Sequence, residues 1–252
     1  MNIPDTAVRR ISTHVLYARR QNDFACSQAW YASRSAMLVE VETVGGLVEW
    51  GEAFGPAAIS AAVVGLMVDA NHACDVADAF AYARACADLD LQWFEKPVIP
   101  EDLAGYAEVR CASTILVAGG EAAFTRFGFR DMFMATAVDI AQPDAMAVGG
   151  ITECKRVFDL ASAFGMRCNP PVWGTGIGLA ASLQLLAVLP HSPSALQPRE
   201  PMLEFDCTEH PIRPAVLQQP VAPVRGRIAI PTGPGLGIEV DRSALARFRP
   251  GP

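Results

Sequence analysis

From residue 65 onward, short apolar runs alternate with longer segments that are alanine-rich or amphipathic. Short apolar runs bounded by turn residues are typical of buried strands, and the longer segments have the length of one helix. The pattern predicts strands at 66–69, 91–95, 115–118, 138–142, 166–169 and about 195–204, with helices near 74–88, 101–111, 125–135, 151–164 and 177–189. Six such units in succession predict an α/β fold with a parallel sheet, as in part of a TIM-type (β/α) barrel.

The N-terminal residues follow a different pattern, in which apolar and polar residues alternate. The segments RRISTHVLYARR, AMLVEVET and LVEWGEA are typical of antiparallel strands, and the Gly45-Gly46 pair between the last two predicts a hairpin turn. We therefore expect a small β-rich domain at 1–64 and a barrel domain at 65–217. The tail at 218–252 is rich in proline and glycine, and we expect it to return and pack on the N-terminal domain.

The chain is too short for a complete barrel behind such a domain. Eight strands with their helices take roughly 250 residues, whereas only about 190 remain here. We therefore expect a truncated barrel that lacks two of its units. Its open strand edges would promote pairing with another chain, so we also expect a homo-oligomer.

Charge and composition narrow the classes of partner. A net charge of −7 without any run of Lys or Arg argues against nucleic acid or an anionic membrane surface as partner. The N-terminus has no apolar signal-peptide core, and the longest uncharged run, between Arg167 and Arg199, is broken by prolines and glycines. The seven cysteines are scattered and lack a CxxC spacing, as in a reducing compartment. We expect a cytoplasmic location.

Three of the predicted strands are followed by an acid. Asp69, Glu95 and Glu121 come at intervals of 26 residues, which is the length of one strand and one helix. Because parallel strands end at the same edge of a sheet, we expect these carboxylates to converge. Three carboxylates without a histidine or thiol are suited to a hard cation, and we predict Mg²⁺. The alternative is that Asp69 caps a helix and both glutamates are ordinary loop acids.

Several motifs resemble the mandelate racemase/muconate lactonizing enzyme branch of the enolase superfamily, and the resemblance covers nearly the whole chain. The motifs are VDAN at 68–71, WFEKP at 93–97, AGGE at 118–121, DIAQPD at 139–144, GGITE at 149–153 and PVWGTGIGLAASLQ at 171–184. The C-terminal segments REPMLEFDCTEHPIRPAVL and IPTGPGLGIEVDR are similar to those of D-galactarolactone cycloisomerases and related sugar-acid dehydratases.

The resemblance implies roles for individual residues. Asp69, Glu95 and Glu121 would bind a Mg²⁺ that stabilises the enediolate formed when a base removes the proton next to a substrate carboxylate. Asp144 would orient a histidine on the next strand, and Glu204 would lie across the substrate as an acid or hydrogen-bond donor. The alternatives are a turn residue for Asp144 and a surface acid for Glu204.

Two departures from the family concern its usual bases. The chain passes from AAVV at 61–64 directly to GLMVDAN, which omits the family's first two barrel strands together with their Lys-x-Lys motif. The histidine of the family's PHVWG motif is Pro171 here. His72 is the nearby imidazole, and an imidazole has a suitable pKa for a substitute base. The alternative is that His72 is an exposed residue at the start of the next helix. Lys96 replaces a second glutamate, and strand alternation predicts that it points away from Glu95.

The resemblance therefore implies a Mg²⁺-dependent lyase or isomerase that acts on a sugar acid or its lactone, with reduced activity. The alternative is a non-catalytic remnant that binds a metal ion or a sugar acid.

Overall fold

The computed structural model describes residues 8–26, 29–46, 48–53, 67–89, 91–190, 200–206 and 210–248. The chain divides into two compact units. The first contains residues 1–66, 85–91 and 223–227, and the second contains 67–84, 92–222 and 228–252. The junction between AAVV and GLMVDAN lies outside the described residues.

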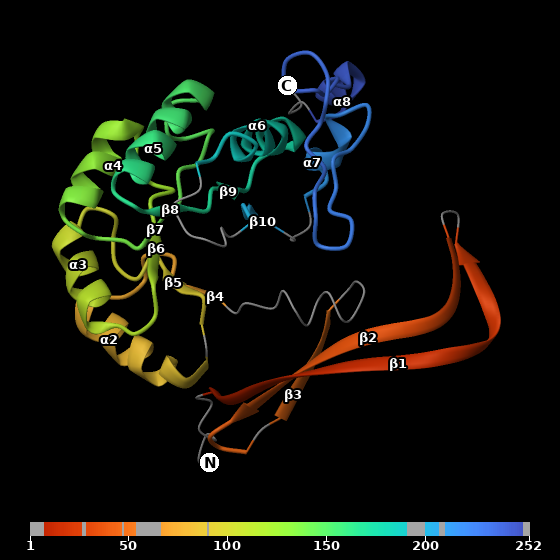
Figure 1. Cartoon of the computed structure of the whole chain (residues 1–252), viewed down its shortest axis with the longest axis horizontal. Coiled ribbons are helices and arrows are strands. Elements are labelled where there is room, and N and C mark those ends of the chain that lie inside the picture. Colours follow the sequence, from red (N-terminus) through yellow and green to blue (C-terminus); the bar gives the residue numbers. More distant parts are fainter. Residues whose placement is uncertain are drawn as a thin grey trace. The chain divides into compact units, whose positions relative to one another are not determined.

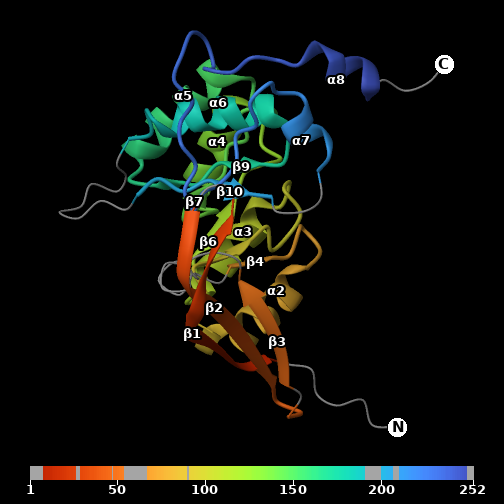
Figure 2. The ribbon, with the colours of Figure 1, turned by 90° about the vertical axis from the view of Figure 1, so that its right-hand side faces the viewer.

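The first unit is built on an antiparallel sheet with the strand order β1-β2-β3. Its strands are β1 (Val8–Cys26), β2 (Ala29–Thr43) and β3 (Val48–Ala53). At the predicted hairpin, Gly46 has a φ of 80° and its N–H donates to the carbonyl of Thr43 at 3.0 Å. The antiparallel strands and this turn are confirmed. β1 and β2 are longer than predicted and form the long ribbon seen in Figures 1 and 2.

The second unit contains a five-stranded parallel sheet with the order β4-β5-β6-β7-β8. The strands are β4 (Met67–Asp69), β5 (Trp93–Glu95), β6 (Val117–Gly119), β7 (Ile140–Ala141) and β8 (Arg167–Cys168). Two further strands, β9 (Pro171–Val172) and β10 (Glu204–Phe205), form a separate parallel pair. The α/β class and the parallel order are therefore confirmed, although the strands of the five-stranded sheet are shorter than predicted. β9 was not predicted, and residues 195–199 of the predicted strand at about 195–204 lie outside the described residues.

Helices follow the strands along the chain, and those between β4 and β8 pack on one side of the five-stranded sheet (Figure 1). Their bounds are α2 (Val76–Ala85), the 3-10 turn η1 (Ala87–Leu89), α3 (Leu103–Ala112), α4 (Thr125–Met134), α5 (Ile151–Ala163), α6 (Gly176–Leu186), α7 (Ile212–Ala215) and α8 (Arg242–Arg247). None of these described helices has the length and apolar character needed to cross a membrane.

The two faces of the parallel sheet have different surroundings. Phe94 of β5 faces the helices and stacks on Tyr82 of α2, with ring centroids 5.4 Å apart. On the other face, buried Trp93, Ala118 and Ile140 pack together. Since side chains alternate along a strand, Glu95 lies on the same face as Trp93, directly above this apolar layer. The layer supports the carboxyl edge of the sheet, where the predicted site residues lie.

The C-terminal tail packs on α6 within the second unit. The side-chain amide of Gln184 donates to the carbonyls of Pro231 at 2.7 Å and Leu236 at 3.2 Å. At the start of the tail, the N–H of Gln218 donates to the carbonyl of Glu239 at 2.9 Å and links two parts of the tail. Packing of the tail on the N-terminal domain stays a prediction.

Candidate active site

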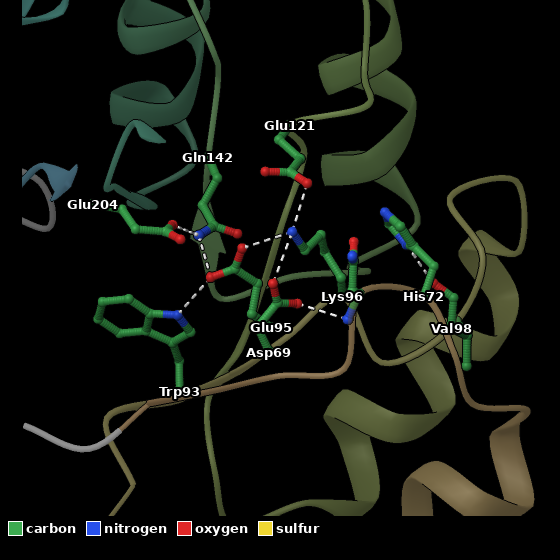
Figure 3. A network of polar contacts seen from close by, with 10 residues as sticks. Asp69, His72, Trp93, Glu95, Lys96, Val98, Glu121, Gln142 and Glu204 are labelled. Carbon is green, nitrogen blue, oxygen red and sulfur yellow. Dashed lines mark hydrogen bonds and ion pairs between the residues drawn. The ribbon is translucent and has the colours of Figure 1, made fainter. Parts of the chain in front are cut away.

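Three carboxylates from three consecutive strands surround one ammonium group at the edge of the sheet (Figure 3). The Nζ atom of Lys96 lies 3.0 Å from Asp69 Oδ2, 3.3 Å from Glu95 Oε1 and 2.5 Å from Glu121 Oε1. The predicted convergence of the acids is therefore present. The group at the centre belongs to Lys96, which was predicted to point away from Glu95.

The strand register explains how Asp69 and Glu95 meet. The two residues are direct partners in the parallel pairing of β4 with β5. Glu121 follows two glycines, and Gly120 has a φ of 125°, where an added Cβ would lie 2.6 Å from the ring of Phe129. Only glycine adopts this positive φ without strain and leaves room for the Phe129 ring. Gly120 therefore lets the chain turn and bring Glu121 back over the edge.

The prediction that Lys96 points away from Glu95 is wrong. Lys96 lies just beyond the end of β5 with a φ of 46°, so the alternation of the strand no longer fixes its direction. Its side chain is 3% exposed. Burial alone would lower the pKa of Lys96, but hydrogen bonds to Glu121 and Asp69 outweigh burial and raise the pKa above its usual range. The group is therefore a buried cation.

Glu95 forms the floor of the cluster. Its Oε2 accepts hydrogen bonds from Trp93 Nε1 at 3.0 Å and from Gln142 Nε2 at 2.7 Å. Its other oxygen, Oε1, is buried and accepts no hydrogen bond, although Lys96 Nζ lies 3.3 Å away. One buried carboxylate oxygen thus depends on a nearby cation for its stabilisation.

Glu204 lies beside the cluster at the start of β10. Its Oε2 accepts a hydrogen bond from Gln142 Nε2 at 3.0 Å, so one amide links Glu204 to Glu95. Burial and then the charge of Glu95 raise the pKa of Glu204 to about 7. In the pairing of β9 with β10, Glu204 is the direct partner of Pro171, where the family motif has histidine.

His72 lies on the opposite side of the cluster from Glu204 (Figure 3). Its φ is 66°, and its backbone N–H donates to the carbonyl of Lys96 at 2.8 Å. The ring Nδ1 is 2.8 Å from the carbonyl of Val98. A carbonyl only accepts hydrogen bonds, so Nδ1 carries a proton and, in the neutral ring, Nε2 has the free lone pair.

Asp144 lies in the turn that follows β7. Its Oδ1 accepts a hydrogen bond from the N–H of Met146 at 2.8 Å, and its carbonyl accepts from the N–H of Val148. Burial raises the pKa of Asp144, the hydrogen bond from Met146 opposes this, and the charge of Glu121 adds to the rise. With proline at 171, the histidine that Asp144 would orient is absent from the chain's sequence.

Sequence reasoning missed Gln142, Trp93 and Tyr106. Gln142 directly follows β7, much as Asp69 and Glu95 end β4 and β5, so the same rule applied to amides would have found it. Trp93 precedes Glu95 by two residues, which places both on one face. Tyr106 is buried beneath Gly119, and burial together with the nearby carboxylates raises its pKa. No sequence signal distinguishes it from an ordinary core aromatic.

The donor chemistry of the cluster suits a divalent cation, but its present arrangement does not. Three carboxylates surround one point, and carboxylate oxygens are the ligands that Mg²⁺ prefers. One of these oxygens, Glu95 Oε1, is buried and has no hydrogen-bond donor. In the part of the chain that the structure describes, however, no group of three His, Cys, Asp or Glu side chains is arranged to hold a metal ion. Lys96 Nζ occupies the point on which the oxygens converge.

The names of known proteins with similar sequences describe enzymes that act on sugar acids or their lactones. D-galactarolactone cycloisomerase from Agrobacterium fabrum is 46% identical over 184 residues, which are 73% of this chain and 49% of that protein. L-rhamnonate dehydratase from Saccharopolyspora erythraea is 35% identical over 186 residues, 70% of this chain and 44% of that protein. The chain spans about half the length of these curated relatives.

Solved structures have the same fold. A mandelate racemase/muconate lactonizing enzyme-like protein from Rubrobacter xylanophilus matches with a TM-score of 0.66 and 31% identity over 77% of this chain and 48% of that chain. The 3,6-anhydro-D-galactonate cycloisomerase from Zobellia galactanivorans has a TM-score of 0.67 and covers 96% of this chain and 99% of its own, but its 22% identity shows the fold alone. The family model described as enolase C-terminal domain-like matches residues 51–244. The chain therefore belongs to this family, in the mandelate racemase/muconate lactonizing enzyme branch of the enolase superfamily.

Proposed function

We propose that this chain is a lyase or isomerase that removes the proton next to the carboxylate of a sugar acid or its lactone, at a rate well below that of a complete family enzyme. The observation that carries the proposal is the convergence of Asp69, Glu95 and Glu121 around one cation. The 46% identity with a D-galactarolactone cycloisomerase supports a galactarate-type lactone as the substrate class.

The exposure of the cluster indicates where a substrate would enter. Glu95 is buried, with 1% of its side chain exposed, whereas Asp69 and Glu121 are 39% and 29% exposed. The open side therefore lies between Asp69 and Glu121. We propose that these three residues bind Mg²⁺ once Lys96 moves aside. When bound, the cation supplies a positive charge that makes the proton next to a substrate carboxylate more acidic.

Proton transfer then falls to groups beside the cluster. In the metal-free chain, burial and the charge of Glu95 raise the pKa of Glu204 to about 7, so this carboxyl is a candidate for general acid–base catalysis beside the cluster. His72 offers Nε2 as a base on the other side. Loss of a positioned base costs about 10²–10⁴ in rate, and both usual family bases are absent, so we expect weak turnover.

Exchange of the substrate's α-proton with D₂O is the sensitive test, because exchange needs only proton removal and return. We expect slow incorporation of deuterium into D-galactarolactone or galactarate in the presence of Mg²⁺, followed by NMR. Glu204→Gln should reduce exchange at least tenfold if Glu204 is the base, and His72→Asn should do so if His72 is. Asp131→Asn, an exposed residue of α4, is the matched control.

The alternative is a remnant that binds a metal ion or a sugar acid without chemistry. Pro171→His separates the two, because it places an imidazole as the strand partner of Glu204. Exchange that rises in this variant supports a working site that lacks a base. An absence of exchange in both the unaltered chain and Pro171→His, with ligand binding retained, would establish the remnant. A cytoplasmic location is part of the same proposal.

A further inference from the structure

Lys96 satisfies the geometric conditions of a bound cation. Its ammonium group has three N–H donors, and its Nζ lies within 3.3 Å of one oxygen from each of three carboxylates. The side chain is 3% exposed, so little water competes for these contacts. It is one of two lysines in the chain, the other being Lys155, whose side chain is 40% exposed on α5.

The carboxylates need this charge. Three carboxylates at such short distances repel one another, and the buried Oε1 of Glu95 accepts no hydrogen bond. Removing one partner from a buried ion pair leaves an uncompensated charge, which is strongly destabilising. The ammonium of Lys96 is therefore the group that allows the three acids to remain close together.

The same position excludes a metal ion while Lys96 occupies it. Mg²⁺ requires its oxygen ligands at about 2.0–2.1 Å in a nearly octahedral arrangement. An ion that close to the oxygens of Asp69 and Glu121 would overlap Nζ, which lies 3.0 Å and 2.5 Å from them. The two cations cannot share the site.

We propose that Lys96 is a resident counter-ion of the three-carboxylate cluster and that a divalent cation binds only by displacing its ammonium group. The second half rests on the proposed function. The exit lies between the partly exposed side chains of Asp69 and Glu121, and the flexible four-carbon stem of lysine allows the movement. Lys96 thus sets the cation affinity of the site and keeps the chain folded without metal.

The charge-neutral variant Lys96→Met gives opposite effects with and without metal. Methionine keeps an unbranched stem at the same backbone angle, so the change is chiefly the lost charge. Without metal, we expect the Tm to fall by about 5–10 °C. Mg²⁺ should bind Lys96→Met at least about tenfold more tightly than the unaltered chain, measured by titration calorimetry, and should restore the lost Tm.

Lys155→Met is the matched control, because it removes the same charge at an exposed site. It should leave both the metal-free Tm and the Mg²⁺ affinity close to those of the unaltered chain. Equal Mg²⁺ affinity in Lys96→Met and in the unaltered chain would overturn the displacement, and an unchanged metal-free Tm in Lys96→Met would overturn the counter-ion role.

Lys155 also serves as an internal reference for chemical labelling. With an amine-specific acylating reagent and peptide mass mapping of the metal-free chain, Lys155 should react and Lys96 should be protected at least tenfold, because its donors are engaged and buried. Equal labelling of the two lysines would contradict the position assigned to Lys96.

Failure of this inference differs from failure of the proposed function. If both chains bind Mg²⁺ equally, the displacement is wrong and the proposed metal ligands stand. If neither binds Mg²⁺, the metal part of both proposals falls, while the metal-free Tm of Lys96→Met still decides the counter-ion role.

Discussion

At the scale of single residues, the environment of Glu204 ties the stability of the metal-free chain to pH. Its pKa is raised to about 7 by burial first and by the charge of Glu95 second, against an unfolded value of 4.5. Between these two values the folded state binds more protons than the unfolded state. The contribution of Glu204 to the free energy of unfolding therefore falls as pH rises from 4.5 to 7.

Glu204→Gln should remove that fall. The amide keeps an acceptor for Gln142 and has no charge to bury. Relative to the unaltered chain, the variant should gain about 1–2 kcal/mol between pH 4.5 and pH 8, after allowance for the partly exposed carboxyl. Denaturant unfolding at both pH values, without metal, measures this.

Glu153→Gln gives a profile of opposite sign as a control. The hydrogen bond from the N–H of Arg126 and the ion pairs with Arg156 and Arg126 lower the pKa of Glu153. The stabilisation by Glu153 is present above pH 4.5 and is lost as pH falls through the lowered pKa.

If the stability of Glu204→Gln differs from that of the unaltered chain equally at pH 4.5 and pH 8, the raised pKa of Glu204 is wrong.

The sequence predicted the acids of the site but not the cation between them. Strand ends and intervals placed Asp69, Glu95 and Glu121, because parallel register carries directly into space. The direction of the Lys96 side chain was not predicted because Lys96 is the first residue after a strand and has a positive φ, which no hydrophobic pattern reveals. Gln142 carries no charge, so the pattern of acids at strand ends does not include it.

At the scale of elements, α3 shows how a side chain fixes the start of a helix. Asp102 is the N-cap, and its Oδ1 accepts a hydrogen bond from the N–H of Gly105 at 2.8 Å. Asp102→Ala should lower the free energy of unfolding by about 1 kcal/mol, or the Tm by roughly 2–4 °C. Differential scanning calorimetry checks this.

Glu108→Ala is the control for the cap, since Glu108 is exposed on the same helix. It should change the stability by less than about 0.5 kcal/mol. A loss as large as that of Asp102→Ala would mean that the acidic residues of α3 act through general charge and not through the cap.

Helix bounds were largely predictable and strand lengths were not. The predicted helix at 125–135 ends within one residue of α4, because its apolar period is clear. Strands β7 and β8 have two residues each, since only the residues that pair with neighbours count as strand. β9 lies in the segment PPVWG, where proline masks the strand signal, and its partner β10 is far away in sequence.

At the scale of the whole molecule, the five-stranded sheet has two ends. Among the described residues, β4 pairs only with β5 and β8 only with β7, whereas a closed barrel has no such edges. We therefore predict that the chain self-associates as its concentration rises, which sedimentation velocity would show. A single monomeric species at the highest concentration would contradict this.

A charge on the edge strand should weaken the association. Met67 begins β4 and is 44% exposed, so Met67→Lys places a charge on the edge and discourages pairing with another chain. Val188→Lys, at a 52% exposed position after α6, adds the same charge away from the edge. We expect the dissociation constant to rise at least tenfold in Met67→Lys and to change little in Val188→Lys.

The opposed positions of Glu204 and His72 carry a stereochemical consequence. Figure 3 shows Glu204 and His72 on opposite sides of the cluster, so in the proposed mechanism a planar carbanion held between them would present one face to the carboxyl and the other to the imidazole. A proton taken and returned by one of these groups retains configuration, whereas epimerisation requires both. If only one of the two is active, the chain would exchange deuterium into a single prochiral or chiral position without inverting it. Since each group reaches a different face, the epimer whose α-proton exchanges would then identify the active residue.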